Sequence, residues 1–201
     1  MNTTLPARMR FTTLSSVAAA LLLAAGCSST PPTRFHSLQA DAAASPSAAP
    51  AGLVDLGPIG IPPAVDQPQW VVRMADGSLR VLEQERWVGP LRDDLRAAVL
   101  DRLRAGNGFG DVRNAPPPAP PAWRVRLDVQ RFDTVAGTGV ALEARWTAVP
   151  PGATAGFACA AALQQHGGAD ALALAAAHRR AVAALADRIG ASLIAGACPA
   201  P

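Results

Sequence analysis

The chain has 201 residues, which is enough for one modest globular domain and some additional segments. Its 18 basic residues, all arginine, nearly balance 15 acidic ones, and this balance gives no support to nucleic-acid binding, which needs a clustered basic face. Alanine accounts for 45 residues, so large apolar side chains are few and we expect a compact core. The sequence contains no glycine-rich phosphate loop, no CxxC pair and no HExxH motif.

The first 26 residues have the pattern of a bacterial lipoprotein signal peptide. Arg8 and Arg10 give a positively charged start, and the short apolar run at 17–23 leads to Leu-Ala-Ala-Gly-Cys at 23–27. This run is well short of the roughly 20 residues that cross a bilayer, so we predict a cleaved signal rather than a permanent transmembrane helix. The alternative is an ordinary secretion signal that is followed by an incidental cysteine.

The end of this segment resembles a lipobox, the motif that directs lipidation and cleavage. It predicts cleavage after Gly26 and acylation of Cys27, where several acyl chains would give stable anchoring. Ser28, in place of an aspartate, favours the periplasmic face of the outer membrane over retention at the inner membrane. Residues 27–33 then form a lipidated tether that reaches at most about 20 Å from the membrane surface.

The first half of the mature chain alternates short strand patterns with turns. The Asp-Gly pair at 76–77 separates two strand patterns and predicts a hairpin. Pro90 begins a helix in which large apolar residues recur every fourth position and form one apolar stripe. We predict strands at 34–38, 53–59, 69–74 and 78–83, a flexible loop at 41–52, a helix from 90 to the Gly-Asn-Gly segment at 106–108, and a proline-rich loop at 114–122.

The second half has the clearest strand patterns. Apolar and polar residues alternate at 123–130 and at 140–147, which predicts strands with one buried and one wet face. A third strand begins near 157 and ends near the Gly-Gly pair at 167–168, and an alanine-rich helix follows at about 169–195. We therefore predict an α+β fold, in which an antiparallel sheet carries two helices on one face. This single domain occupies residues 34–198, behind the lipoprotein signal peptide.

The sequence contains little that would support catalysis. None of the three histidines (His36, His166 and His178) has metal-ligand spacing to another histidine or to a cysteine. Asp93 and Asp94 fall in the first turn of a predicted helix, where acids complement the helix dipole. No GxSxG motif occurs. We therefore predict a protein that is not an enzyme and that uses no cofactor or metal.

Cys159 and Cys198 are candidates for a disulfide, because secretion would place them in an oxidising compartment. Cys159 should point inward from the third strand, and the last helix should carry Cys198 back toward it. The resulting loop of about 40 residues would contribute on the order of 3 to 4 kcal/mol. The alternative is two separate thiols.

The four tryptophans are mostly expected in the core, because they follow the strand alternation. Trp87 is less certain, since it lies with Arg86 just before the first helix. These two residues are our candidates for a partner-binding surface, and the alternative for Trp87 is a place in the core.

Several segments together resemble the ABC-type transport auxiliary lipoproteins (PqiC-like). The resemblance runs from the lipobox to the last helix, and its most characteristic segments lie at 56–62 (LGPIGIP), 65–73 (VDQPQWVVR), 85–91 (ERWVGPL), 126–132 (RLDVQRF) and 142–146 (LEARW). Gln67 stands where the family usually has arginine, and Val88-Gly89 replace Ala-Glu. The resemblance implies the family's fold, and the departures bear on any partner contact that depends on those charges.

The resemblance also implies a non-enzymatic subunit of a lipid transport system between the inner and outer membranes. Its partners would be a periplasm-spanning MCE-domain protein and an inner-membrane transporter component, and the system would support envelope integrity. Cys27 would be the anchor in the outer membrane, and several copies would form a homo-oligomeric ring. The alternative is a stand-alone structural or assembly lipoprotein of the outer membrane.

Overall fold

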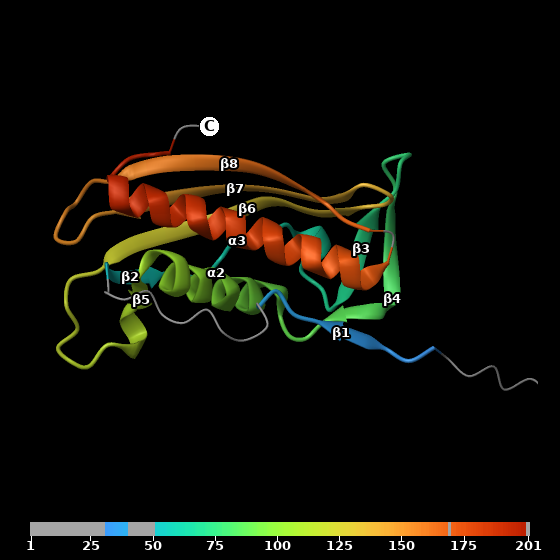
Figure 1. Ribbon diagram of the computed structural model, residues 1–201, viewed down its shortest axis with the longest axis horizontal. Coiled ribbons are helices and arrows are strands. Elements are labelled where there is room, and N and C mark those ends of the chain that lie inside the picture. Colours follow the sequence, from blue (N-terminus) through green and yellow to red (C-terminus); the bar gives the residue numbers. More distant parts are fainter. Residues whose placement is uncertain (1–30, 40–50, 169, 200–201) are drawn as a thin grey trace, which may run out of the picture. The chain divides into compact units, whose positions relative to one another are not determined.

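The computed structural model describes residues 31–39, 51–168 and 170–199. Gly26, Cys27 and the rest of the predicted signal peptide lie outside these residues, as does the tether up to residue 30. The elements of the described chain, which belong to the unit Thr33–Pro201, are labelled in Figure 1. In chain order they are β1 (Arg34–His36), β2 (Gly52–Leu56), η1 (Pro63–Val65), β3 (Gln69–Arg73), β4 (Leu79–Trp87), α2 (Leu91–Asn107), β5 (Phe109–Asp111), η2 (Val112–Asn114), β6 (Trp123–Val135), β7 (Gly139–Val149), β8 (Phe157–His166) and α3 (Ala171–Ala195).

The long strand β6 organises the sheet because neighbouring strands use both of its edges. On one edge it pairs with β7, which in turn pairs with β8. On the other edge, β2 pairs with the beginning of β6 and β3 pairs with its end. The sheet continues from β3 to β4 and β1, and from β2 to β5.

The sheet is mixed, whereas the sequence predicted antiparallel strands. In the described part of the chain, β3–β4, β6–β7 and β7–β8 are antiparallel, and β1–β4, β2–β5, β2–β6 and β3–β6 are parallel. Alternation of apolar and polar residues indicates which face of a strand is buried, but it does not indicate the direction of the neighbouring strand. Each parallel pair joins strands that are separated by other elements, because a parallel return needs a crossover. The predicted α+β class is confirmed.

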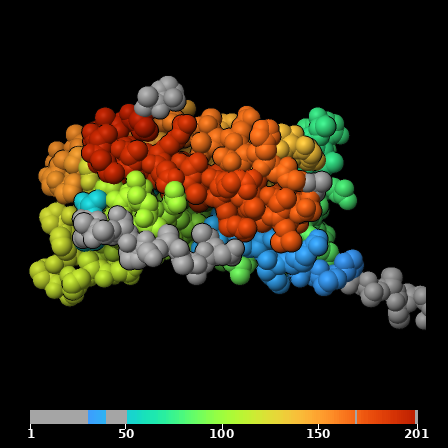
Figure 2. Space-filling model, in the orientation of Figure 1, coloured from blue at the N-terminus to red at the C-terminus, as the bar shows by residue number. Residues whose placement is uncertain are grey.

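Helices α2 and α3 pack against each other and cover one face of the sheet, as predicted (Figure 1). The stripe on α2 formed by Leu91, Leu95, Val99 and Leu103 is buried. Gly108 ends this helix in a left-handed conformation, with a φ of 74°, that favours glycine. In Figure 2, α3 (orange to red) runs across the near face beside α2 (green).

Strand β6 has the predicted buried and exposed faces over 123–130, and β7 has them over 142–148, whereas Ala141, on the predicted exposed face, is buried. Val125, Leu127 and Val129 are buried, while Arg124 and Arg126 between them are exposed. A register shift between Val129 and Arg131 then changes this alternation, and Phe132, Asp133 and Thr134 are all buried. The apolar and polar alternation did not predict this irregularity.

The hairpin at Asp76-Gly77 is confirmed, since the Met74 backbone N–H donates to the Ser78 carbonyl over 2.9 Å. Strand β4 is longer than predicted and continues to Trp87, and α3 begins at Ala171 rather than at 169. Asp170 caps α3 by accepting from the Ala173 backbone N–H. Strand β5 and the short helix η2 were not predicted. Neither helix in the described chain has the length and apolar character that crossing a membrane requires.

Candidate functional site

The segment that leads from the predicted tether into the domain is attached by two buried carboxylates. Strand β1 pairs with the end of β4, which brings Arg34 and His36 to Glu85. The Arg34 Nε donates to Glu85 Oε1 over 2.9 Å, and His36 Nε2 and Glu85 Oε2 are hydrogen-bonded at 2.7 Å. Burial alone would raise the pKa of the Glu85 carboxyl, but these hydrogen bonds and the nearby charges hold it below its usual value.

Asp94 provides the second attachment, just after β1. One of its carboxylate oxygens accepts from the Ser37 hydroxyl over 2.9 Å, and the other accepts from the Leu38 backbone N–H over 2.8 Å. From the sequence, Asp94 was predicted only to complement the dipole of α2 in its first turn. Glu85 and Asp94 were therefore missed as attachment residues, because their partners are more than 48 positions away in the sequence.

Trp87 lies inside the domain, which corrects its assignment to a partner surface. It is 5% exposed, and its ring lies 4.8 Å from Trp70 and 5.4 Å from His178, between ring centroids. Phe132 stacks on His178 at 4.6 Å and lies 5.9 Å from Trp87, again between ring centroids. Trp87 faces the core because it pairs with the buried His36 across β1 and β4, and this register is a tertiary property.

His178 is a buried, neutral member of this aromatic cluster. Its Nε2 is hydrogen-bonded to the Thr134 hydroxyl at 2.8 Å. Burial lowers the pKa of the imidazole to about 3, so it stays uncharged near neutral pH. His36 and His178 thus have structural partners in the core, and His166 lies apart from them on β8. No group of three or more potential metal ligands occurs among the described residues.

A surface groove of about 450 Å³ lies beside Arg86, between β1, the loop after η1 and the start of α2. Its walls include Phe35 and Val88, whose side chains are exposed, and Pro68. Arg86 is half-buried and has no carboxylate within ion-pair distance in the described chain. The Arg86 Nε donates to the Glu83 backbone carbonyl over 3.4 Å, and Asp66, which also lines the groove, is paired with Arg92. Apolar walls with a guanidinium that has no carboxylate partner give this groove the chemistry of a protein-binding site.

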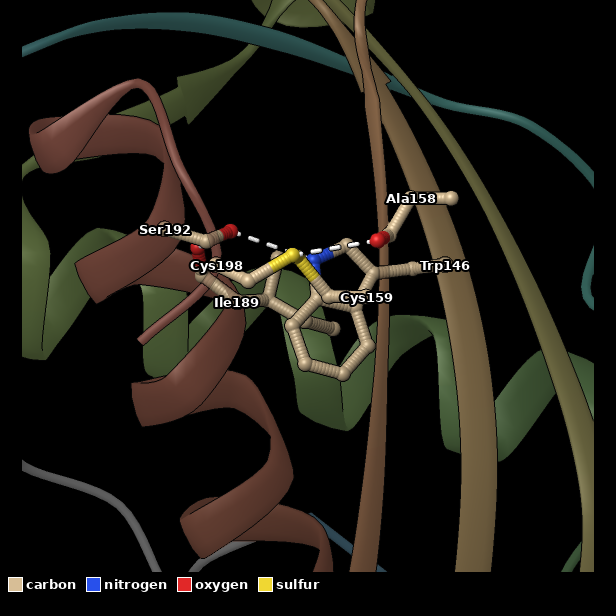
Figure 3. Close-up of a disulfide and its surroundings, with 6 residues drawn as sticks. All are labelled: Trp146, Ala158, Cys159, Ile189, Ser192 and Cys198. Atoms are coloured by element: carbon tan, nitrogen blue, oxygen red, sulfur yellow. Dashed lines mark hydrogen bonds between the residues drawn. A yellow bond between two sulfur atoms is a disulfide. The ribbon is translucent and has the colours of Figure 1, made fainter. Parts of the chain in front are cut away.

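Cys159 and Cys198 are joined by a disulfide in the structure, just after the C-terminal end of α3 (Figure 3). Their Cα atoms are 5.5 Å apart, a normal separation for such a bond. Beside it, the Trp146 indole N–H donates to the Ser192 hydroxyl over 3.1 Å, and Trp146 is the cross-strand partner of Cys159. The end of α3 is thus connected to the sheet by one covalent bond and one buried hydrogen bond.

Comparisons with known proteins agree on a family and a fold. A profile described as "ABC-type transport auxiliary lipoprotein component" matches residues 36–190. No curated protein matches the sequence.

Two solved structures share the fold at low sequence identity. One is an uncharacterised protein with a TM-score of 0.59 and 13% identity, aligned over 80% of this chain and 98% of its own. Another is a Xanthomonas campestris protein of the DUF330 family with a TM-score of 0.53 and 19% identity, aligned over 84% of this chain and 90% of its own. With a profile match over most of its length, the chain belongs to the ABC-type transport auxiliary lipoprotein family.

Proposed function

We propose that this protein is a lipid-anchored periplasmic subunit of an MCE-type lipid transport system, held in the outer membrane by acyl chains on Cys27. The observation that carries this proposal is the order of features along the chain. A lipobox ending at Cys27 is followed by a short tether and then, from residue 36, by the transport auxiliary domain. In this role the protein catalyses no reaction and supports envelope integrity by positioning the transporter.

The attachment of β1 supports a positional mechanism. An anchor at Cys27 acts on the domain through β1, and the buried carboxylates of Glu85 and Asp94 hold β1 and the residues after it. Because both carboxylates are buried and hydrogen-bonded, this connection resists displacement better than exposed ion pairs would. The segment through which the anchor would act is therefore held firmly on the domain, as an adaptor requires.

The groove beside Arg86 is our candidate contact for the MCE-domain protein. Exposed Phe35 and Val88 supply apolar contact, and the Arg86 guanidinium can pair with a carboxylate of the partner. An inner-membrane transporter component would complete the system. Assembly of several copies into a ring belongs to the same proposal, with lipid passing through a common opening rather than through one subunit.

Affinity purification from gently solubilised membranes tests the proposal. The full-length protein with Cys27 intact should retain an MCE-domain protein, and Cys27→Ser should leave the membrane fraction and lose that partner. Recovery of outer-membrane assembly factors alone would instead support a stand-alone assembly lipoprotein.

A charge reversal tests the groove separately. Arg86→Glu should reduce recovery of the MCE-domain protein, because it places a carboxylate where the partner's carboxylate would bind. Arg113→Glu is the matched control, since Arg113 also has no carboxylate within ion-pair distance in the described chain but belongs to η2, outside the groove. Equal recovery of the MCE-domain protein with both variants would remove the groove from the proposal.

The proposed ring is tested separately. Light scattering of the purified protein measures its molar mass and so shows whether several copies assemble.

A further inference from the structure

Exposed apolar side chains gather at one end of the domain. Six large apolar side chains are exposed in the described part of the chain. Three of them, Leu79, Val81 and Leu172, belong to the hairpin strand β4 and the first turn of α3. Phe35 and Val88 flank the groove described above, and Ile194 lies in the last turn of α3.

Backbone contacts place the β3–β4 hairpin and the start of α3 at the same end (Figure 1). The Ala136 N–H, in the β6–β7 turn, donates to the Arg73 carbonyl next to the hairpin turn. In the same β6–β7 turn, the Thr138 carbonyl accepts from the Gly167 N–H, just before α3. The three turns therefore lie next to one another, and the exposed Leu79 and Leu172 flank them.

The predicted tether enters the domain at this end. The Thr33 hydroxyl donates to Gln84 Oε1 over 3.1 Å, three residues from Val81 on β4. The Ser37 carbonyl, just after β1, accepts from the Arg179 guanidinium of α3 over 3.5 Å. The segment that contains β1 therefore lies against the first half of α3.

We infer that this end of the domain, presenting Leu79, Val81 and Leu172, rests on the lipid bilayer. The inference depends on the proposed acylation of Cys27. Thr33 is six positions after Cys27, so the tether spans about 20 Å at most. Leu172 and Ile194 are 22 positions apart on α3, or about 33 Å, so the end that carries Ile194 lies more than one tether length from the end that carries Leu172.

The composition of this end suits the membrane interface. Leu79, Val81 and Leu172 offer apolar groups to the acyl-chain boundary, and the exposed Arg80 between the first two can contact lipid phosphate. With this end on the bilayer, α3 extends away from the membrane. The groove beside Arg86 then remains open on the side for a protein partner.

Quenching by brominated lipid tests the orientation. The acylated full-length protein is incorporated into phosphatidylethanolamine–phosphatidylglycerol vesicles with plain or brominated acyl chains, as the native protein and as Leu172→Trp, Val81→Trp and Ile194→Trp. The native emission, from tryptophans at 70, 87, 123 and 146, is subtracted. Leu172 and Ile194 are a matched pair, because they lie on one helix and are 72% and 65% exposed.

We expect about a twofold loss of the added emission in brominated vesicles for Leu172→Trp and Val81→Trp, and none for Ile194→Trp. Vesicle-bound protein without quenching at residues 172 and 81, or with equal quenching at 194, would overturn this orientation while leaving the anchor intact. The former result would favour a protein partner for these side chains. Protein that does not sediment with the vesicles would overturn the anchor at Cys27 and the orientation together.

Discussion

The two halves of helix α3 are held to the sheet by different chemistry. Near its middle, His178 lies among Trp70, Trp87 and Phe132 and hydrogen-bonds to Thr134. Near its end, the chain is bonded covalently to β8 through Cys159 and Cys198. The first attachment depends on a histidine that must stay neutral, and the second depends on an oxidising environment.

This difference indicates which condition should loosen each half. Acid acts on the half that contains His178, because protonating a buried imidazole is unfavourable. Reduction acts on the half that ends at Cys198. The start of the domain is held in the same noncovalent way as the half of α3 that contains His178, because hydrogen bonds to Glu85 and Asp94 hold β1 and the residues after it.

Removing the disulfide should have the largest effect. Cys159→Ser with Cys198→Ser opens a loop with a sequence separation of 39 residues, and loop entropy predicts a loss of about 4 kcal/mol in the free energy of unfolding. Urea denaturation of the oxidised protein and the double variant measures this loss. Thiol titration of the native, unreduced protein is the check, and two reactive thiols at these positions would contradict the disulfide.

Acid should destabilise the fold through His178. In the unfolded chain this histidine protonates near pH 6.5, whereas in the fold it stays neutral down to about pH 3, so the unfolded state binds the extra proton between these values. Stability from this group is complete above pH 6.5 and is lost as the pH falls. Linkage gives a loss of about 2 kcal/mol between pH 7 and pH 5.

A glutamine substitution isolates this contribution. His178→Gln should flatten the dependence of the unfolding free energy on pH between 7 and 5, whatever its effect on stability at pH 7. His166→Gln, at an exposed position at the end of β8, should leave that slope unchanged. An unchanged slope in His178→Gln would show that the buried histidine is not the group responsible.

Glu85→Ala should loosen the attachment of β1. It leaves His36 buried without its hydrogen-bond partner, which costs about 2 kcal/mol. We expect faster hydrogen exchange at the β1–β4 amides together with the lower stability. Glu83→Ala is the matched control, because Glu83 is exposed on the same strand. If both variants exchange alike, Glu85 does not hold β1.

The ion pair between Arg102 of α2 and Asp187 of α3 should have the smallest effect. Its two hydrogen bonds measure 2.8 and 2.9 Å, but the two side chains are 44% and 43% exposed, so Arg102→Ala should lower stability by only about 0.5 kcal/mol. Thermal unfolding of this variant, compared with Arg104→Ala, measures the difference. A loss as large as that of the disulfide variant would mean that the helix pair, not the covalent bond, holds the end of α3.

The amino-acid sequence predicted the local patterns well because each depends on neighbouring residues. The stripe of Leu91, Leu95, Val99 and Leu103 repeats at helical spacing, and the alternation at 123–129 repeats at strand spacing. The Asp76-Gly77 turn is equally local. The family resemblance also came from short segments of sequence, and the profile match over residues 36–190 agrees with it.

Only the tertiary structure decided which distant residues meet. The direction of β1, β2 and β3 relative to their neighbours depends on crossovers that no local pattern encodes. The same holds for the buried place of Trp87 and for the contacts of Glu85 and Asp94 with β1 and the residues after it. By itself, the sequence determined which side chains are apolar and how they repeat along each segment, because helix and strand periods are properties of the backbone. The fold determined which of those side chains stay exposed around the tether, because that depends on how separate segments pack.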